Sequence, residues 1–217
     1  MEIAHVSDTG VRALFVDIGG VLATNGWDTD SREASVEHFG LDAMAIDSRH
    51  RQMFELFETD RISWKQYLDR VVFNVPRPFT YDEFTRFVLA HSRAYPEMIE
   101  LVRRVKKNHG LKVVIVSNEG RELTEYRLKL LDLASVADIF VCSCFAHLRK
   151  PDTAIFRLAC DLAFVEPQEV VYIEDRALFV EVAASLGIRG IVHRGVESTR
   201  AALAEMGLFE QPAARGA

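Results

Sequence analysis

Four groups of polar residues in this sequence of 217 residues could carry chemistry, because each offers side chains that bind or transfer charged groups. They are Asp17 with Gly19 and Gly20, Ser117 with Asn118, Lys150 with Pro151, and the adjacent pair Glu174 and Asp175. The carboxylates offer the oxygen ligands that Mg²⁺ prefers. The lysine and the serine could neutralise and orient phosphoryl oxygens, and an aspartate placed in line could act as the nucleophile. Together these residue types predict a phosphoryl-transfer site.

Each of these groups follows a run of apolar residues, directly or after a short loop. The runs cover residues 13–16, 113–116, 139–142 and 170–173, with a fifth at 188–192. Continuous apolar runs of this length are typical of strands that are buried on both faces. Strand and helical patterns alternate from residue 111 to 207, which predicts a parallel sheet with crossover helices. Because ligands bind beyond the carboxyl ends of the strands in such a sheet, we expect the four groups to meet at one edge.

Residues 27–95 interrupt this alternation. Their apolar residues keep a helical period, and Ser63 with Gln66 and Thr80 with Glu83 form capping boxes that begin two helices. Pro96 predicts the start of a helix that returns to the sheet. We therefore expect a sheet core from residues 1–24 and 96–217, with a helical insertion at 25–95. The aromatic residues of the insertion are expected mostly to pack against one another, and none is assigned to the substrate: Trp27, His50, Phe54, Phe57, Trp64, Tyr67 and Phe73.

The charge balance disfavours some partners. Lys and Arg number 26 against 32 Asp and Glu, a net charge of −6, so no basic surface for nucleic acid or anionic lipid is implied. The N-terminus lacks a signal-peptide pattern and no apolar run is long enough to cross a bilayer, so we expect a cytoplasmic protein without a membrane partner. Cys142 and Cys144 are expected on one face of a strand and Cys160 in a helix, all as buried reduced thiols.

At these motifs the sequence resembles the haloacid dehalogenase superfamily. The matching stretches are residues 15–22 (FVDIGGVL), 116–118 (VSN), 149–152 (RKPD) and 172–175 (YIED). Each stretch alone is short, and their order at successive strand ends makes the match specific. The resemblance implies an α/β fold with a Rossmann-like parallel sheet flanked by helices, and an inserted α-helical cap at 25–95 that shapes specificity.

The same resemblance assigns roles to the motif residues. It implies that Asp17 is the nucleophile and a metal ligand, that the carbonyl of Gly19 and the carboxylate of Asp175 are further ligands, and that Glu174 supports the metal. It also implies that Ser117, Asn118 and Lys150 hold the phosphoryl group. The expected cofactor is Mg²⁺, the expected substrate a small phosphorylated metabolite, and the expected reaction phosphomonoester hydrolysis through an aspartyl-phosphate.

One position departs from the family's phosphatase pattern. Those enzymes usually carry a second aspartate two residues after the nucleophile, where it protonates the leaving group, and this sequence has Gly19 there. Losing a general acid typically removes about 10² to 10⁴ in rate. Asn25, Asp28 and Asp30 are the nearest polar residues in sequence, and of these only the two aspartates could readily transfer a proton.

Several alternatives therefore stay open. The protein could be a phosphatase restricted to good leaving groups, a phosphatase with a substitute acid, or a weakly active or inactive protein that binds a phosphorylated ligand. A haloacid dehalogenase is a further alternative, because halide leaves without a proton. The acidic pair at 174–175 disfavours it, since the family's dehalogenases generally lack a metal. Ser117 and Asn118 could instead begin the following helix as a cap, and Glu119 and Arg176 could face either the crevice or solvent.

Overall fold

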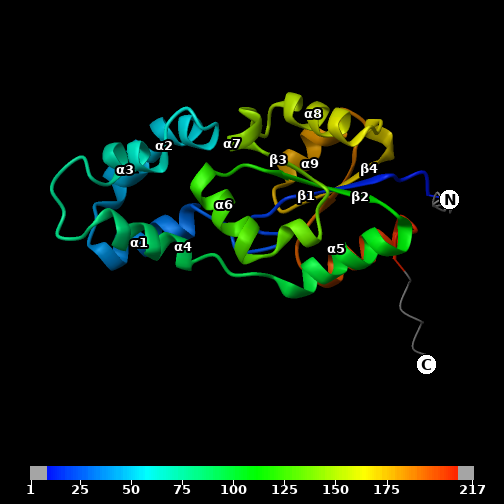
Figure 1. Ribbon diagram of the computed structural model, residues 1–217, viewed down its shortest axis with the longest axis horizontal. Coiled ribbons are helices and arrows are strands. Elements are labelled where there is room, and N and C mark those ends of the chain that lie inside the picture. The colour runs from blue at the N-terminus through cyan, green and yellow to red at the C-terminus, as the bar shows by residue number, and fades with distance from the viewer. Residues whose placement is uncertain (1–8, 210–217) are drawn as a thin grey trace.

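The computed structural model describes residues 9–209, which contain a five-stranded parallel sheet in the order β3-β2-β1-β4-β5 (Figure 1). The strands are β1 (Ala13–Val16), β2 (Lys112–Ser117), β3 (Ile139–Cys142), β4 (Val170–Glu174) and β5 (Arg189–Val192). Each predicted apolar run is one of these strands, which confirms the expected α/β fold. β1 lies at the centre of the sheet because it pairs with both β2 and β4.

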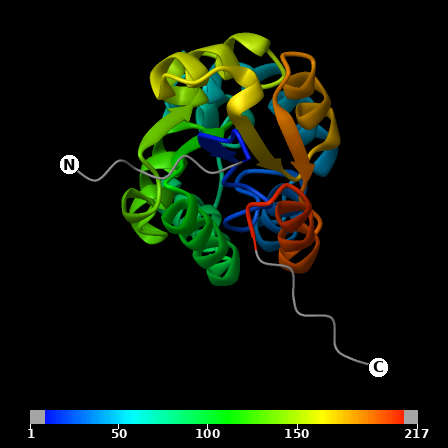
Figure 2. The same cartoon turned by 90° about the vertical axis from the view of Figure 1, so that its right-hand side faces the viewer.

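Helices cover both faces of the sheet, as Figure 2 shows. One face packs against α5 (Pro96–His109) and α10 (Val196–Glu205), and the other against α8 (Thr153–Ala163) and α9 (Ala177–Ala184). Alternate residues of β1 enter different cores, since Leu14 and Val16 join the first and Ala13 and Phe15 the second. This burial on both faces explains why the strands are continuous apolar runs. The remaining elements of this part are α6 (Arg121–Leu130), α7 (Ser143–Ala146) and two 3-10 turns, Leu133–Ser135 and Pro167–Glu169.

Four further helices lie beyond one end of the sheet (Figure 1). They are α1 (Thr29–Phe39), α2 (Ala43–Glu58), α3 (Trp64–Val71) and α4 (Tyr81–Ala90), and they share a hydrophobic core of their own that includes Phe57, Tyr67 and Phe84. The capping boxes at Ser63 and Thr80 both form, and Pro96 opens α5 as predicted. We call residues 25–95 the helical segment. Its role as a substrate-covering cap stays a prediction.

The two connections between the sheet and the helical segment lie side by side. Thr24 N–H donates to the Arg93 carbonyl at 2.9 Å, and the Thr24 hydroxyl donates to the His91 carbonyl at 2.7 Å. Tyr95 N–H donates to the Leu22 carbonyl at 2.8 Å. The chain therefore leaves the sheet and returns to it at one place.

The strand register brings the predicted groups together. Val16 of β1 pairs with Ile115 of β2 and with Ile173 of β4, so the carboxyl ends of these three strands lie level. Asp17 N–H donates to the Ile173 carbonyl at 3.1 Å and continues this alignment past the last paired residue.

One local expectation was wrong. Cys142 ends β3, but Cys144 lies in α7, because the chain turns into a helix at Ser143. All three cysteines are nonetheless buried free thiols, and burial raises the pKa of Cys144 and of Cys160 to about 11. Among the helices of residues 9–209, none is long and apolar enough to span a membrane.

Candidate active site

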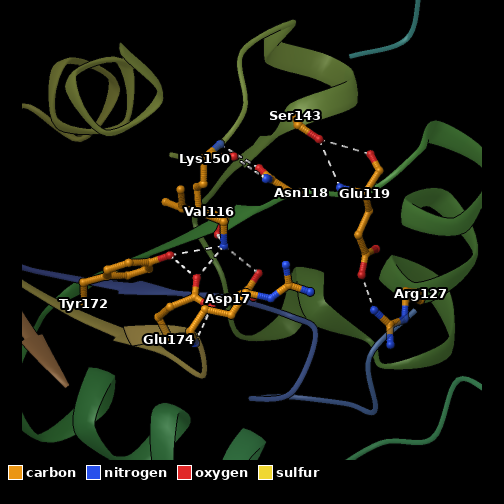
Figure 3. A network of polar contacts seen from close by, with 10 residues as sticks. Asp17, Val116, Asn118, Glu119, Arg127, Ser143, Lys150, Tyr172 and Glu174 are labelled. Atoms are coloured by element: carbon orange, nitrogen blue, oxygen red, sulfur yellow. Dashed lines mark hydrogen bonds and ion pairs between the residues drawn. The ribbon is translucent and has the colours of Figure 1, made fainter. Parts of the chain in front are cut away.

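A fully buried lysine lies at the centre of the site (Figure 3). Lys150 Nζ donates to the Val116 carbonyl at 3.0 Å, to Tyr172 Oη at 3.2 Å and to Glu174 Oε2 at 2.6 Å. It also forms an ion pair with Asp17 Oδ1 at 3.1 Å. Burial by itself lowers the pKa of Lys150, but the carboxylates of Asp17 and Glu174 outweigh it and hold that pKa above its usual range. The ammonium is therefore charged and fixed beside Asp17.

Asn118 positions this lysine through its backbone. The Asn118 side-chain amide donates to the Lys150 carbonyl at 2.8 Å, and its Oδ1 accepts from Lys150 N–H at 2.9 Å. Ser117 lies beside Asp17 and lines the same cavity. The alternative in which Ser117 and Asn118 cap the next helix was wrong. The N-cap residue of α6 is Gly120, and no side chain forms a capping hydrogen bond at this helix start.

Three carboxylates meet at the ends of β1 and β4. Asp17, Glu174 and Asp175 each place an oxygen within 4.8 Å of the others. Both Glu174 oxygens are occupied: Oε2 accepts from Lys150 and from the Tyr172 hydroxyl, and Oε1 accepts from Arg176 N–H at 3.1 Å. In contrast, neither Oδ1 of Asp17 nor Oδ1 of Asp175 has a hydrogen-bond partner among the described residues, although the Asp17 atom is held in the ion pair with Lys150.

The electrostatics of this cluster favour a bound cation. Burial raises the pKa of Asp17, the charge of Glu174 raises it further, and Lys150 only partly opposes both. Gly20 has a φ of +70°, and a Cβ there would lie 2.2 Å from Asp175 Oδ2, so only glycine lets that carboxylate approach. Three carboxylates against one ammonium, with a buried Asp175 oxygen that has no partner among the described residues, fit a hard divalent ion such as Mg²⁺.

The space beside Gly19 is already filled. A Cβ at position 19 would lie 2.8 Å from Asn25 Oδ1, so the Asn25 amide stands where an aspartate side chain would begin. Asn25 and Asp28 both line the cavity, while Asp28 also caps α1 by accepting from Ser31 N–H at 2.9 Å. Asp30 lies in the first turn of α1, exposed and away from the cavity lining.

The cavity of about 660 Å³, its open mouth included, lies between the strand ends and the helical segment. Asp17, Ser117 and Lys150 line its inner end, and Glu119 and Arg176 also line it. The helical segment contributes both polar and aromatic residues: Asn25, Gly26, Trp27, Asp28, His50, Phe54, Phe57 and Glu58. Most of the aromatic residues singled out in the sequence belong to the core of the helical segment, as expected. Four of the seven singled out line the cavity: Trp27, His50, Phe54 and Phe57.

Sequence reasoning missed the pair that closes this cavity on one side. Glu58, the last residue of α2, accepts from Arg149 at 2.8 Å and 3.0 Å. Burial raises the pKa of Glu58 and Arg149 opposes the rise. Asp60 pairs with Arg121 at 2.7 Å, so these two ion pairs join the end of α2 to the sheet core. The spacing of Glu58 after Phe54 on one helix face could have indicated it.

Glu119 has a structural partner. Its carboxylate turns to the fully buried Arg127, as Figure 3 shows, and Arg127 also donates to the Thr24 carbonyl. Burial raises the pKa of Glu119, and Arg127 opposes that rise. The pair joins the loop after β2 to the connection that leads into the helical segment.

The sequence is similar to those of several known proteins. A family model for haloacid dehalogenase-like hydrolases matches residues 11–187. A phosphorylated carbohydrates phosphatase of Thermotoga maritima is 35% identical over 101 residues, 45% of this chain and 46% of that protein. An (S)-2-haloacid dehalogenase 4A of Burkholderia cepacia is 31% identical over 98 residues, 45% of this chain and 42% of that protein. These matches span less than half the length of either relative.

Solved structures share the fold over most of the chain. A magnesium complex of a haloacid dehalogenase family enzyme from Bacteroides thetaiotaomicron has a TM-score of 0.73 at 18% identity, covering 85% of this chain and 93% of that one. A predicted haloacid dehalogenase-like family hydrolase from Porphyromonas gingivalis also has a TM-score of 0.73, at 19% identity, covering 93% of this chain and 99% of that one. At these identities the likeness establishes the fold.

Proposed function

The chain belongs to the haloacid dehalogenase-like hydrolases, and on this premise we propose that it is a magnesium-dependent phosphatase acting on a small phosphorylated metabolite. The observation that carries the proposal is the cluster of Asp17, Glu174 and Asp175, in which Asp17 and Glu174 also pair with the buried ammonium of Lys150. The phosphorylated carbohydrates phosphatase among the relatives supports the substrate class.

The proposed metal ligands are carboxylate oxygens of Asp17 and Asp175, together with one backbone carbonyl. Asp17 and Asp175 each hold a buried oxygen without a hydrogen-bond partner in the described chain, and the carbonyl of Gly19 is the proposed third ligand. Glu174 acts differently, because both of its oxygens already orient Lys150, Tyr172 and the Arg176 amide. Magnesium, when bound, supplies positive charge that offsets both the carboxylates and the phosphoryl oxygens. The magnesium complex of the Bacteroides enzyme supports this choice of ion.

The proposed reaction uses the chain's own groups in two steps. A carboxylate oxygen of Asp17 attacks phosphorus, the bond from phosphorus to the leaving oxygen breaks, and the leaving group takes up a proton from water. Water then hydrolyses the aspartyl-phosphate and releases phosphate. Lys150 and Ser117 hold the phosphoryl oxygens throughout, and Asn118 keeps the lysine in place.

Gly19 limits the first step, because it cannot supply that proton. We therefore expect faster hydrolysis of esters whose leaving groups are weakly basic. The same residue favours the second candidate function, a weakly active or inactive protein that recognises a phosphorylated ligand, since Asn25 fills the space of the usual acid. Dehalogenation is less well supported, because the cluster of Asp17, Glu174 and Asp175 fits a cation that this reaction does not need.

Phosphate release distinguishes these functions. Purified protein is assayed with Mg²⁺ on a panel of sugar phosphates, an activated aryl phosphate and a 2-haloacid, with Asp17→Asn as the matched control. Phosphate release that requires Mg²⁺ and is lost in Asp17→Asn supports the phosphatase. Formation of a beryllofluoride adduct without turnover of any phosphate ester supports the binding protein, and chloride release without Mg²⁺ supports the dehalogenase.

A further inference from the structure

One face of α2 lines the cavity opposite the reacting groups. His50, Phe54, Phe57 and Glu58 lie at helical spacings of four, seven and eight residues, which places them on the same side of the helix. All four line the cavity that also contains Asp17. A substrate with its phosphoryl group at Asp17 would therefore present its leaving group to this face.

A chain of hydrogen bonds fixes the protonation of His50. Trp27 Nε1, which can only donate, donates to Tyr67 Oη at 2.6 Å. Tyr67 is fully buried, so its own hydroxyl hydrogen needs an acceptor, and His50 Nδ1 at 2.8 Å is the acceptor that residues 9–209 supply. The reverse arrangement would give the hydroxyl two donors and leave its hydrogen buried and unpaired, which is costly. The Nδ1 atom of His50 is therefore the acceptor, and Nε2 carries the proton.

The surroundings keep this imidazole neutral. Burial lowers the pKa of His50 to about 4, and Arg32 of α1 and Arg51 of α2 lower it while Asp47 of α2 opposes them. From α3, Tyr67 faces the ring edge-on, with centroids 6.2 Å apart. At neutral pH the residue thus has one fixed lone pair, directed at Tyr67, and one fixed N–H group.

The N–H group is left for a ligand. No other described residue bonds to Nε2, and the atom is not among those buried without a partner, so it keeps access to the cavity that His50 lines. Aromatic rings line the cavity near His50. The centroid of the Phe54 ring lies 5.3 Å from that of the imidazole, and Trp27 lines the same cavity. A single donor among aromatic surfaces suits a leaving group with an apolar face and an oxygen acceptor, such as a sugar or another polyol.

We propose that His50 is a specificity residue: its Nε2–H donates a hydrogen bond to a hydroxyl or carbonyl oxygen of the leaving group, at the far side of the cavity from Asp17. The proposal rests on the proposed phosphatase function. It assigns to the helical segment a recognition role for leaving groups that carry an acceptor over those that carry none.

Two substitutions distinguish the roles of the two ring nitrogens of His50. The amide of His50→Gln reaches the position of Nε2 and keeps a donor there, but it leaves the Tyr67 hydroxyl without its acceptor. The amide of His50→Asn reaches the position of Nδ1 and accepts from Tyr67, but it offers no donor to the cavity. The kcat/KM values of both variants are compared on the best hexose phosphate and on phenyl phosphate, whose leaving group has no additional acceptor.

We expect opposite orders in two measurements. On the hexose phosphate, kcat/KM of His50→Gln exceeds that of His50→Asn by roughly 3- to 10-fold, the worth of one neutral hydrogen bond, while on phenyl phosphate the ratio is near one. In thermal unfolding His50→Asn is the more stable variant. A purely structural role would make both measurements follow the same order, and that result would overturn the proposal.

The tautomer gives a readout independent of turnover. Nitrogen NMR of the wild-type protein at neutral pH should show the His50 proton on Nε2, and a proton on Nδ1 would contradict the proposal directly. If the wild type hydrolyses none of the phosphate esters, the proposed function fails. If it hydrolyses them but the hexose phosphate ratio between the variants is near one, only the role of His50 fails.

Discussion

Restoring the missing acid is the sharpest test of how Gly19 limits the reaction. A Gly19→Asp change by itself would place a Cβ 2.8 Å from Asn25 Oδ1, closer than such contacts normally allow, so the Asn25 side chain must move, and shortening it removes this conflict. The perturbation is therefore Gly19→Asp combined with Asn25→Ala. The backbone at position 19 does not have a positive φ, so it accepts a side chain.

The magnitude follows from what a general acid contributes. A positioned acid is worth about 10² to 10⁴ in rate, which is roughly 3 to 5 kcal/mol of activation free energy. We expect the double variant to raise kcat on alkyl phosphates within this range over Asn25→Ala alone. On an aryl phosphate with a good leaving group the rise should be less than about 10-fold, since little proton transfer is needed there.

The assay is Mg²⁺-dependent phosphate release across leaving groups of graded basicity. Gly19→Asn in the Asn25→Ala background is the matched control, because it has the same size as the aspartate variant but transfers no proton. If Gly19→Asp and Gly19→Asn give the same rates, or if the gain is equal for alkyl and aryl phosphates, proton supply is not the limitation and the reasoning is refuted.

Three further predictions concern the charged groups around the cavity. Because burial and Glu174 raise the pKa of Asp17, its charge destabilises the metal-free fold as pH rises above about 3.8. Asp17→Asn should therefore have a higher Tm than wild type in EDTA at pH 7 and a smaller Tm gain from added Mg²⁺; a lower Tm would contradict this. The raised pKa of Lys150 means that the folded state keeps a proton that the unfolded chain loses, so the unfolding free energy should fall as pH passes above about 10.5. Urea unfolding across that range should show a smaller fall in Lys150→Met. Arg127→Met leaves Glu119 buried and unpaired, and should cost about 3 to 5 kcal/mol in urea unfolding. Adding Glu119→Gln should recover part of the loss, and no recovery would mean that the pair is not the cause.

The strands and the meeting of the motifs could be predicted because both follow from local patterns. Runs such as 113–116 are apolar throughout since the sheet is covered on both faces, and parallel strands bring their carboxyl ends to one edge. That argument predicted from the sequence alone that Asp17, Lys150 and Asp175 lie near one another. It failed at Cys144, where the chain turns into α7 immediately after β3, because no glycine or proline marks the change.

Contacts across the cavity could not be predicted in the same way. Helical periodicity shows that His50 and Glu58 share a face, but it does not show which residues face them from other segments. Arg149 lies 91 residues after its partner Glu58. The Tyr67 hydroxyl reaches His50 only because α2 packs against α3. Asn118 was likewise expected on the phosphoryl group, and its bonds to the Lys150 backbone became visible only in the folded chain.

The adjacent connections at Thr24 and Arg93 have an evolutionary consequence. A segment whose two ends are joined by hydrogen bonds can be lengthened, shortened or exchanged without displacing the strands on either side. The groups proposed for bond breaking all lie outside residues 25–95, whereas the face proposed for recognising the leaving group belongs to α2. A lineage could thus acquire a new substrate by replacing the residues between these two connections, and inherit its chemistry unchanged.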